Sequence, residues 1–366
     1  MTAALFLSLL LSVWPLEHRD TVKTEIKWPR LLTEDAMPAR NGYTVALVGD
    51  IMMGTTFPEV RLPEYGGARL FSDCAGILSS ADVSAGNLEG VLCDGGKSTK
   101  KVVEGRSYAF RTPVSYTRWL SEAGFDFLSI ANNHSRDFGD EGLQSTMAVL
   151  DSAGIGYAGL PACRSAVKEM AGARFGFCAF GHNSHTLRHT DKSCVESILR
   201  ELRDSCDILI VSFHGGAEGA AMSHLPYGTE TYLGEDRGNL REFARLCIDL
   251  GADIVFGHGP HVTRAVEVYN GRFIAYSLGN FCTPFGMNIS GVNGYAPVIE
   301  VRIGRDGSFR QGKIHSFIQE PGTGPRTDHE DRVARHIADL TRVDIMSPGI
   351  VIAGDGEIMR AADGTF

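Results

Sequence analysis

The sequence lacks several features that define large classes of protein. None of its eight cysteines forms a Cys-x-x-Cys pair, which excludes a zinc knuckle and a thioredoxin-type redox motif. Basic residues do not outnumber acidic ones: 35 Lys and Arg stand against 44 Asp and Glu, a formal net charge of −9. Nucleic-acid-binding proteins neutralise phosphates with a basic face, so no nucleic-acid partner is expected.

Basic residues are also missing before the apolar run in the first sixteen residues, where a secretory signal peptide normally has them. The run is long enough for the apolar core of a signal peptide and short for a membrane span. The alternative for this run is a packed helix. We expect residues 1–42 to be a signal or anchor segment followed by a polar linker, and the protein to be periplasmic or attached to the cell surface or membrane.

The rest of the chain is typical of a well-buried globular protein, with 43% hydrophobic and 22% charged residues. From residue 43 onward, short apolar runs alternate with amphipathic stretches, a pattern that indicates an α/β fold. We expect one large catalytic domain over residues 43–318. Residues 319–366 are expected to form a small extension, with a helix over 329–340 and a hairpin over 351–359.

Five expected strands, over residues 43–48, 82–86, 125–130, 207–213 and 253–256, are each followed closely by a residue able to bind metal or move a proton. These residues are Asp50, Glu89, the pair Asn133 and His134, His214, and His258. Each alone has an ordinary explanation as a turn, cap or satisfied polar group. Because ligands of open α/β sheets gather at the carboxyl ends of strands, we expect the five positions to converge.

The residue types fit a divalent metal site. Imidazole, carboxylate and amide oxygen are ligands for borderline divalent ions, and we expect one or two ions of Mn, Fe or Zn, with a metal-free site as the alternative. Two such ions would clamp the attacking and leaving oxygens of an ester or phosphate. The expected ligands are Asp50, Glu89, Asn133, His214, His258 and His261. His134 is expected to donate a proton to the leaving group.

Six short blocks of the sequence carry a resemblance to a known family. They are Gly49-Asp50-Ile51-Met52, Gly86-Asn87-Leu88-Glu89, Ala131-Asn132-Asn133-His134 through Asp137-Phe138-Gly139, His214-Gly215-Gly216-Ala217-Glu218, Gly257-His258-Gly259-Pro260-His261-Val262, and Tyr276-Ser277-Leu278-Gly279-Asn280-Phe281. In this order, over residues 43–318, they resemble the CapA family of poly-γ-glutamate capsule-biosynthesis proteins. That family is similar to a branch of the calcineurin-like metallophosphoesterases.

The resemblance implies an α/β fold of the calcineurin-like metallophosphoesterase type, a four-layer α/β/β/α sandwich with metals at the strand ends. It implies that Asp50 is the first metal-binding Asp and that Glu89 replaces the bridging carboxylate. Asn133 and His134 then correspond to the superfamily's Asn-His pair. His214 and His258 correspond to its later histidines.

Three positions depart from the superfamily pattern. Met52 stands where the superfamily has a metal-ligating His, and a thioether is a poor ligand for these ions, so one metal position is expected to be weakened. Pro260 adds a residue before His261, which on an extended segment would turn that ring to the opposite side unless the proline bends the loop. Ser135 replaces an acid, for which Asp137 is the candidate substitute.

Further residues are candidates for the site. Glu218 is a candidate second carboxylate that orients His214 or acts as a base. A basic loop with Lys100, Lys101 and Arg106 would attract an anionic polymer if it overhangs the site, although such a run is more often solvated surface. Arg136 is expected to contact substrate, because its neighbours fix its position. The expected catalytic residues are His134, His214, Glu218 and Arg136.

Three functions remain open from the sequence. The first is an enzyme of poly-γ-glutamate or capsule metabolism that hydrolyses or transfers at an amide or phosphoester by metal-activated water, on an anionic polymer or peptide. The second is metal-independent acid–base chemistry, such as epimerase-like proton abstraction at a peptide Cα. The third is a non-catalytic, membrane-side subunit that binds polyglutamate, since the resemblance implies association with a membrane polymerase complex.

Overall fold

The computed structural model describes residues 41–103 and 107–361. The expected N-terminal segment and Arg106 lie outside the described residues. None of the helices in the described ranges has the length and apolar character that crossing a lipid bilayer requires.

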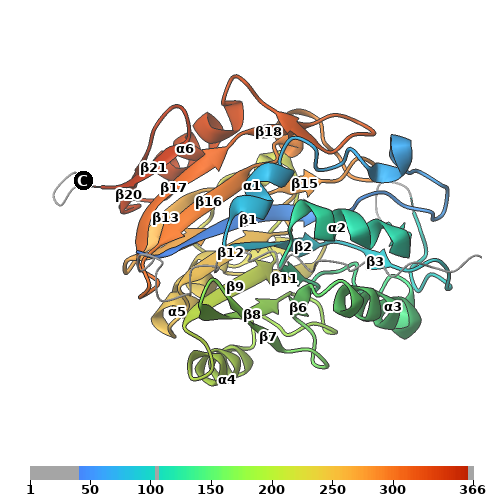
Figure 1. The fold of residues 1–366 in the computed structure, drawn as a ribbon, viewed down its shortest axis with the longest axis horizontal. Coiled ribbons are helices and arrows are strands. Elements are labelled where there is room, and N and C mark those ends of the chain that lie inside the picture. The colour runs from blue at the N-terminus through green and yellow to red at the C-terminus, as the bar shows by residue number, and fades with distance from the viewer. Residues whose placement is uncertain (1–40, 104–106, 362–366) are drawn as a thin grey trace, which may run out of the picture. The chain divides into compact units, whose positions relative to one another are not determined.

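A nine-stranded sheet carries the first half of the expected site (Figure 1). Its order is β20 (Ile350–Ile352), β21 (Glu357–Arg360), β17 (Phe309–His315), β16 (Val298–Ile303), β1 (Tyr43–Ile51), β2 (Val83–Leu88), β5 (Phe127–Ser129) and β6 (Gly156–Ala158), with β15 (Asn280–Cys282) paired to the end of β1. Strands β1, β2, β5 and β6 are parallel. Their carboxyl ends therefore meet at one edge of the sheet.

A six-stranded sheet carries the second half. Its order is β13 (Val266–Tyr269), β14 (Arg272–Ala275), β12 (Ile254–His258), β9 (Ile208–His214), β8 (Ala173–Phe180) and β7 (Ser165–Met170). Strands β14, β12, β9 and β8 are parallel. The hairpin expected at Asn270-Gly271 is confirmed, because β13 and β14 pair antiparallel across it.

Short strands and 3-10 helices connect these elements. The paired short strands are β3 (Val91–Leu92) with β4 (Arg111–Thr112), β10 (Glu230–Tyr232) with β11 (Glu235–Gly238), and β18 (Phe317–Gln319) with β19 (Pro325–Thr327). The 3-10 helices are η2 (Glu64–Gly67), η3 (Val114–Tyr116), η4 (Ala220–Met222) and η5 (Gly291–Gly294).

The two sheets pack face to face because their strands alternate between two apolar surfaces. In β1, Val45 and Leu47 lie in the core between the sheets. The intervening residues of that strand, Ala46 and Val48, pack with the outer helices. The same alternation in β9 places Ile210 in the core between the sheets and Val211 on the outer side.

Helices cover both outer faces. Helices α1 (Ala75–Ser80), α2 (Thr117–Ala123) and α3 (Gly139–Ser152) cover the nine-stranded sheet, and α4 (Lys192–Arg203) and α5 (Leu240–Asp249) cover the six-stranded sheet (Figure 1). Each of α4 and α5 begins at a capping side chain, Asp191 and Asn239, that accepts a backbone N–H bond. The expected four-layer α/β/β/α sandwich is confirmed.

The last described residues join this sandwich. Helix α6 (Arg332–Asp344) places Val333, Ala334 and Ile337 in the core between the sheets. The hairpin expected around Asp355-Gly356 is present, and its second strand, β21, pairs with β17. The residues expected as an extension thus continue the nine-stranded sheet.

Candidate functional site

The ends of β1, β2, β9 and β12 bring the metal-binding residue types together. Asp50 is the register partner of Asn87 in β2, and His258 is the register partner of His214 in β9. Gly49 precedes Asp50 because a Cβ at that position would lie 1.9 Å from the carbonyl oxygen of Gly279. The approach of the backbones at this point requires glycine.

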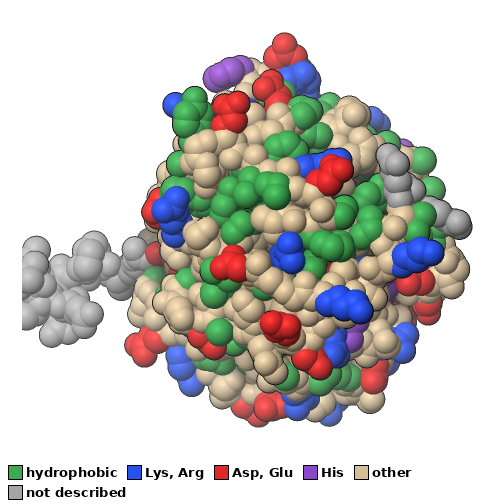
Figure 2. All heavy atoms as spheres, turned by 90° about the vertical axis from the view of Figure 1, so that its right-hand side faces the viewer, with side chains coloured by type: hydrophobic (Ala, Val, Ile, Leu, Met, Phe, Trp, Pro, Cys, Tyr) green, Lys and Arg blue, Asp and Glu red, His purple; other side chains and the backbone are tan. Residues whose placement is uncertain are grey.

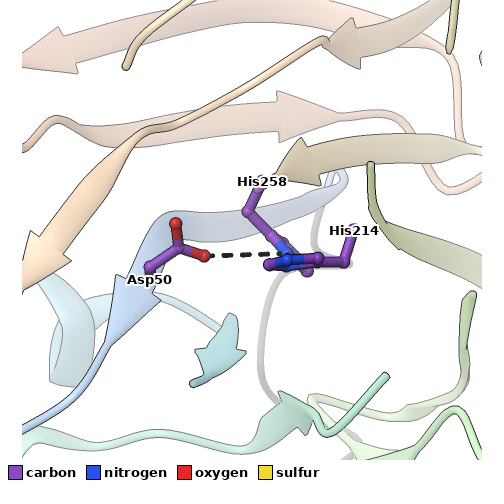
Figure 3. Close-up of side chains that lie close together, drawn as sticks. All are labelled: Asp50, His214 and His258. Carbon is purple, nitrogen blue, oxygen red and sulfur yellow. Dashed lines mark hydrogen bonds and ion pairs between the residues drawn. The ribbon is translucent and has the colours of Figure 1, made fainter. Parts of the chain in front are cut away.

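The first group of candidate ligands is Asp50, His214 and His258, all fully buried (Figure 3). Nδ1 of His258 lies 3.7 Å from Oδ1 of Asp50 and 3.0 Å from Nδ1 of His214. The other ring nitrogen of His258 is 2.7 Å from the hydroxyl of Ser212. This contact fixes the ring so that Nδ1 faces Asp50, as the supporting hydrogen-bond partners of metal-binding histidines do.

The second group is Asp50, Glu89 and His261. Nδ1 of His261 lies 3.0 Å from Oδ2 of Asp50, and its Nε2 lies 3.7 Å from Oε1 of Glu89. Asp50 therefore belongs to both groups, one oxygen facing each. A carboxylate shared by two ligand groups suits a site for two neighbouring ions.

The loop after β12 explains how His261 reaches this centre. An extended chain would have turned its ring away, but Gly259 has φ 110° and His261 has φ 57°, with Pro260 between them. A positive φ is uncommon for a residue other than glycine. The two left-handed residues bend the loop, and the ring returns to Asp50 and Glu89.

The charges of the centre reflect its burial. Burial and the neighbouring Asp50 raise the pKa of Glu89 well above its usual value. Burial also raises the pKa of Asp50, but the hydrogen bond and charge of His261 outweigh it and leave this pKa lowered. Burial opposes protonation of His261, yet Glu89 and Asp50 raise its pKa to about 10. The two carboxylates thus attract a positive charge, which a divalent cation would supply.

The neighbouring histidines favour the neutral form that binds metal. Burial lowers the pKa of His258 to about 4, and burial with the adjacent His258 lowers the pKa of His214 well below its usual value. Three buried atoms of the centre have no hydrogen-bond partner among the described residues: Oε1 of Glu89, Nε2 of His214 and Oδ1 of Asn133. Buried polar atoms are normally paired, so these three atoms suit the coordination of a cation.

Asparagines hold the carboxylates in place. Nδ2 of Asn87 donates to Oδ1 of Asp50 at 2.8 Å and to Oε2 of Glu89 at 3.3 Å, and Asn132 donates to Oδ1 of Asn87 at 3.0 Å. Oδ1 of Asn280 lies 3.1 Å from Nδ1 of His261. These asparagines received no role from the sequence, although an amide inside the apolar strand β2 was a usable indication.

His134 is oriented by a carboxylate three residues later. Its Nδ1 lies 2.8 Å from Oδ2 of Asp137, whose other oxygen is 2.7 Å from Nζ of Lys100. Asp137 also accepts the backbone N–H of Phe110 at 2.7 Å. It therefore takes the place of the acid that Ser135 lacks, and Nε2 of His134 is left for the cavity. Burial lowers the pKa of His134.

Several candidates lie elsewhere than expected. Glu218 does not orient His214: its Oε1 accepts from Nη1 of Arg237 at 2.9 Å, while His214 contacts His258 and Glu89. Glu218 still lines the cavity. Arg136 is paired with Asp140 in an exposed ion pair and is absent from the described lining of the cavity.

The basic loop divides in the same way. Lys100 lies in the cavity wall, with Nζ 2.8 Å from the backbone oxygen of Asn133, but its charge is committed to Asp137. Lys101 is exposed and is absent from the described lining. Met52 is buried, and its methyl group lies beside Gly286.

A group of histidines that the sequence gave no role packs against the centre from the loop after β8. His182 stacks on His214 with ring centroids 5.8 Å apart, and its Nδ1 lies 3.4 Å from the backbone oxygen of His214. His185 contacts the Ser135 hydroxyl at 3.2 Å. His189 is buried against Phe243. Their spacing matched no ligand pattern, because they support the site and are absent from both candidate ligand groups.

The centre opens into a cavity of about 580 Å³. Its polar lining includes Asn133, His134, His185, Glu218, His261 and Asn293, and its apolar lining includes Tyr108, Phe110 and Leu233. The cavity exposes His134 and His261 to a ligand while Asp50, Glu89, His214 and His258 remain fully buried. The arrangement can hold cations at its base and exchange a proton at its wall.

Comparisons with known proteins agree with this site. Residues 44–284 match the model of the family "Bacterial capsule synthesis protein PGA_cap". The PGA biosynthesis protein CapA of Bacillus subtilis (strain 168) is 30% identical over 257 residues, 65% of this chain and 62% of that protein. The capsule biosynthesis protein CapA of Bacillus anthracis is 29% identical over 249 residues, 65% of this chain and 59% of that protein.

The chain thus spans about six tenths of the length of these relatives. Among solved structures, a 5'-nucleotidase precursor from Thermus thermophilus matches 78% of this chain and 56% of its own, with 12% identity and a TM-score of 0.42, which is too low to carry functional weight. The family model covers most of the described sandwich and every residue of both candidate ligand groups. The chain belongs to the bacterial capsule synthesis protein family PGA_cap.

Proposed function

We propose that this protein is a metal-dependent enzyme of poly-γ-glutamate capsule metabolism that hydrolyses or transfers at an amide or phosphoester bond. The observation that carries the proposal is that Asp50 is shared by two candidate ligand groups, one with His214 and His258 and one with Glu89 and His261. Both groups are at the base of a cavity large enough for a substrate segment.

The residues present fit divalent cations. Asp50, Glu89, His214, His258 and His261 would hold them, with the unpartnered Oδ1 of Asn133 as a further oxygen donor. When bound, such ions lower the pKa of water and stabilise negative charge on oxygen. The expected metals are Mn, Fe or Zn.

The remaining chemistry falls to His134. Asp137 accepts at Nδ1 and so fixes the tautomer and orientation of the ring. Lys100 and the N–H of Phe110 hold Asp137 in turn. The ring then presents Nε2 to the cavity, where it gives a proton to the leaving nitrogen or oxygen.

The family and its relatives support the choice of polymer. The Bacillus relatives are named for PGA and capsule biosynthesis, so the proposed substrate is an anionic polymer or peptide, and the proposed role is at the cell envelope. Periplasmic or surface attachment and contact with a membrane polymerase complex are part of the same proposal.

The test combines metal content with turnover. Purified protein is analysed for Mn, Fe and Zn, and then assayed against poly-γ-glutamate and a chromogenic phosphodiester before and after chelation. We expect bound metal, turnover of at least one substrate, and loss of that turnover on chelation with recovery when metal is restored. Full turnover in metal-free protein would overturn the proposal. Polymer binding without any turnover would also overturn it and favour a binding subunit.

A further inference from the structure

A second cavity adjoins the one that holds the candidate metal centre. It has a volume of about 500 Å³. Five residues, Tyr108, Phe110, Gly286, Met287 and Asn288, line both cavities. The two therefore meet along a common wall, and a ligand longer than one cavity can extend from the metal centre into the second.

The second cavity is mainly apolar. Its apolar side chains are Phe57, Pro58, Val102, Tyr108, Phe110 and Met287. The rings of Tyr108 and Phe110 stack, with centroids 6.2 Å apart and an interplanar angle of 7°, and Tyr108 is 39% exposed. Figure 2 shows hydrophobic patches with isolated charged side chains between them on the side of the molecule at the right of Figure 1. Such a wall suits the methylene groups of a ligand.

The hydrogen-bonding capacity of this cavity is small. The hydroxyl of Thr55 donates to the backbone oxygen of Phe57 and accepts the backbone N–H groups of Phe57 and Arg111. A sugar chain presents many hydroxyl groups and would leave them unpaired here. A chain with methylene spacers would not incur that cost.

One cation lies at the rim. The guanidinium of Arg61 is 3.2 Å from Glu59, and the two side chains are 58% and 74% exposed. Exposed ion pairs contribute little, so Arg61 can exchange Glu59 for a carboxylate of a ligand. The cavity thus offers an apolar floor with a carboxylate partner at its edge.

We propose that the second cavity is a chain-binding subsite for a carboxylate-bearing polymer with methylene spacers in its backbone, bound next to the reacting bond. Its apolar side chains take the methylene groups, and Arg61 takes a carboxylate. This inference rests on the proposed function for the identity of the polymer. It adds that several consecutive units of the chain are bound at once.

The test measures binding without turnover. Chelated wild-type protein is titrated with γ-linked glutamate oligomers of increasing length, with α-linked oligomers of the same length and charge, and with a neutral oligosaccharide. We expect γ-linked oligomers that reach the second cavity to bind about tenfold more tightly than shorter ones. The α-linked oligomers and the oligosaccharide should show no such gain.

Variants assign the gain to the cavity. Tyr108→Ala and Arg61→Gln should each reduce it to about threefold or less. Two exposed side chains outside the described lining of either cavity are matched controls, Tyr227 and Arg200. Tyr227→Ala and Arg200→Gln should keep the gain.

The outcomes separate the two proposals. Binding that does not depend on length, an equal gain for α-linked oligomers or the oligosaccharide, or an unchanged gain in Tyr108→Ala would overturn the subsite. A length-dependent gain in a protein that shows no metal-dependent turnover would leave the subsite standing and overturn the proposed function alone.

Discussion

Nδ1 of His261 lies 3.0 Å from Oδ2 of Asp50, although the two residues are 211 positions apart in the chain. Asp50 belongs to β1 of the nine-stranded sheet, and His261 follows β12 of the six-stranded sheet. Glu89 follows β2, while His214 and His258 end β9 and β12. Each candidate ligand group therefore takes side chains from both sheets, and the centre exists only when the sheets are packed.

The shared position of Asp50 predicts unequal effects on metal content. Asp50→Asn should remove the metal of both ligand groups, because the amide loses the charge that both use. His258→Ala and His261→Ala should each remove only the metal of their own group. Metal per chain is measured by elemental analysis after gel filtration.

Circular dichroism supplies the control for these variants. Each should keep the secondary structure of the wild type. Equal metal loss in His258→Ala, His261→Ala and Asp50→Asn would contradict two groups that share one carboxylate.

The bent loop before His261 predicts a strong effect of a single methyl group. In Gly259→Ala, the new Cβ would lie 2.9 Å from backbone atoms of Gly215 at φ 110°. We expect a loss of about 1–3 kcal/mol in the free energy of unfolding and lower metal content, because the loop must shift. Gly271→Ala is a matched control, since Gly271 also has a positive φ but an added Cβ would meet no atom within 4 Å. Denaturant unfolding measures both.

The proton donor predicts a large effect on rate. His134→Gln should lower kcat about 10²–10⁴-fold while metal content stays that of the wild type. Steady-state kinetics on the substrate found for the wild type measures this change. A variant with unchanged kcat would exclude His134 as the proton donor.

The two neighbours of His134 should move the pH profile in opposite directions. Burial lowers the pKa of His134, and within that buried site the charge of Asp137 raises this pKa while the charge of Lys100 lowers it. Since the donor must be protonated, Asp137→Asn should move the alkaline limb of kcat to lower pH. Lys100→Met should move it to higher pH. A purely structural role would lower kcat without moving the limb in opposite directions.

Buried His189 predicts a pH-dependent stability. Burial lowers its pKa to about 3 from an ordinary value of 6.5. The unfolded chain therefore binds a proton that the folded chain does not, and stability falls as the pH drops below 6.5. Wild type should lose about 1.4 kcal/mol per pH unit relative to His189→Gln in this range. Urea unfolding at about pH 7.5 and pH 5.5, on either side of the ordinary histidine pKa, measures the difference, and a parallel loss in both proteins would contradict it.

The sequence predicted the convergence of Asp50, Glu89, His214 and His258 because each follows a parallel strand, and parallel strands end at a common edge. Strand periodicity also predicted the two hairpins at Asn270-Gly271 and Asp355-Gly356. These features depend on local pattern, which the sequence displays directly.

Other features depend on backbone angles and long-range partners. No residue pattern showed that His261 has a positive φ, so the direction of its ring could not be predicted. Arg136 was expected at the substrate, but Asp140, one helical turn later, pairs with it. Glu218 is held by Arg237, nineteen residues away, which its own neighbourhood does not reveal.

Helix α6 and β21 give the chain a constraint during synthesis. Val333, Ala334 and Ile337 close the core between the sheets, and β21 hydrogen-bonds to β17. Because a ribosome releases the chain from its amino end, the strands that carry Asp50 and His258 emerge long before the residues that seal them. The nascent protein must keep a partly open apolar interior from aggregating until residue 360 is free, so shielding by a chaperone is expected to matter most in that interval.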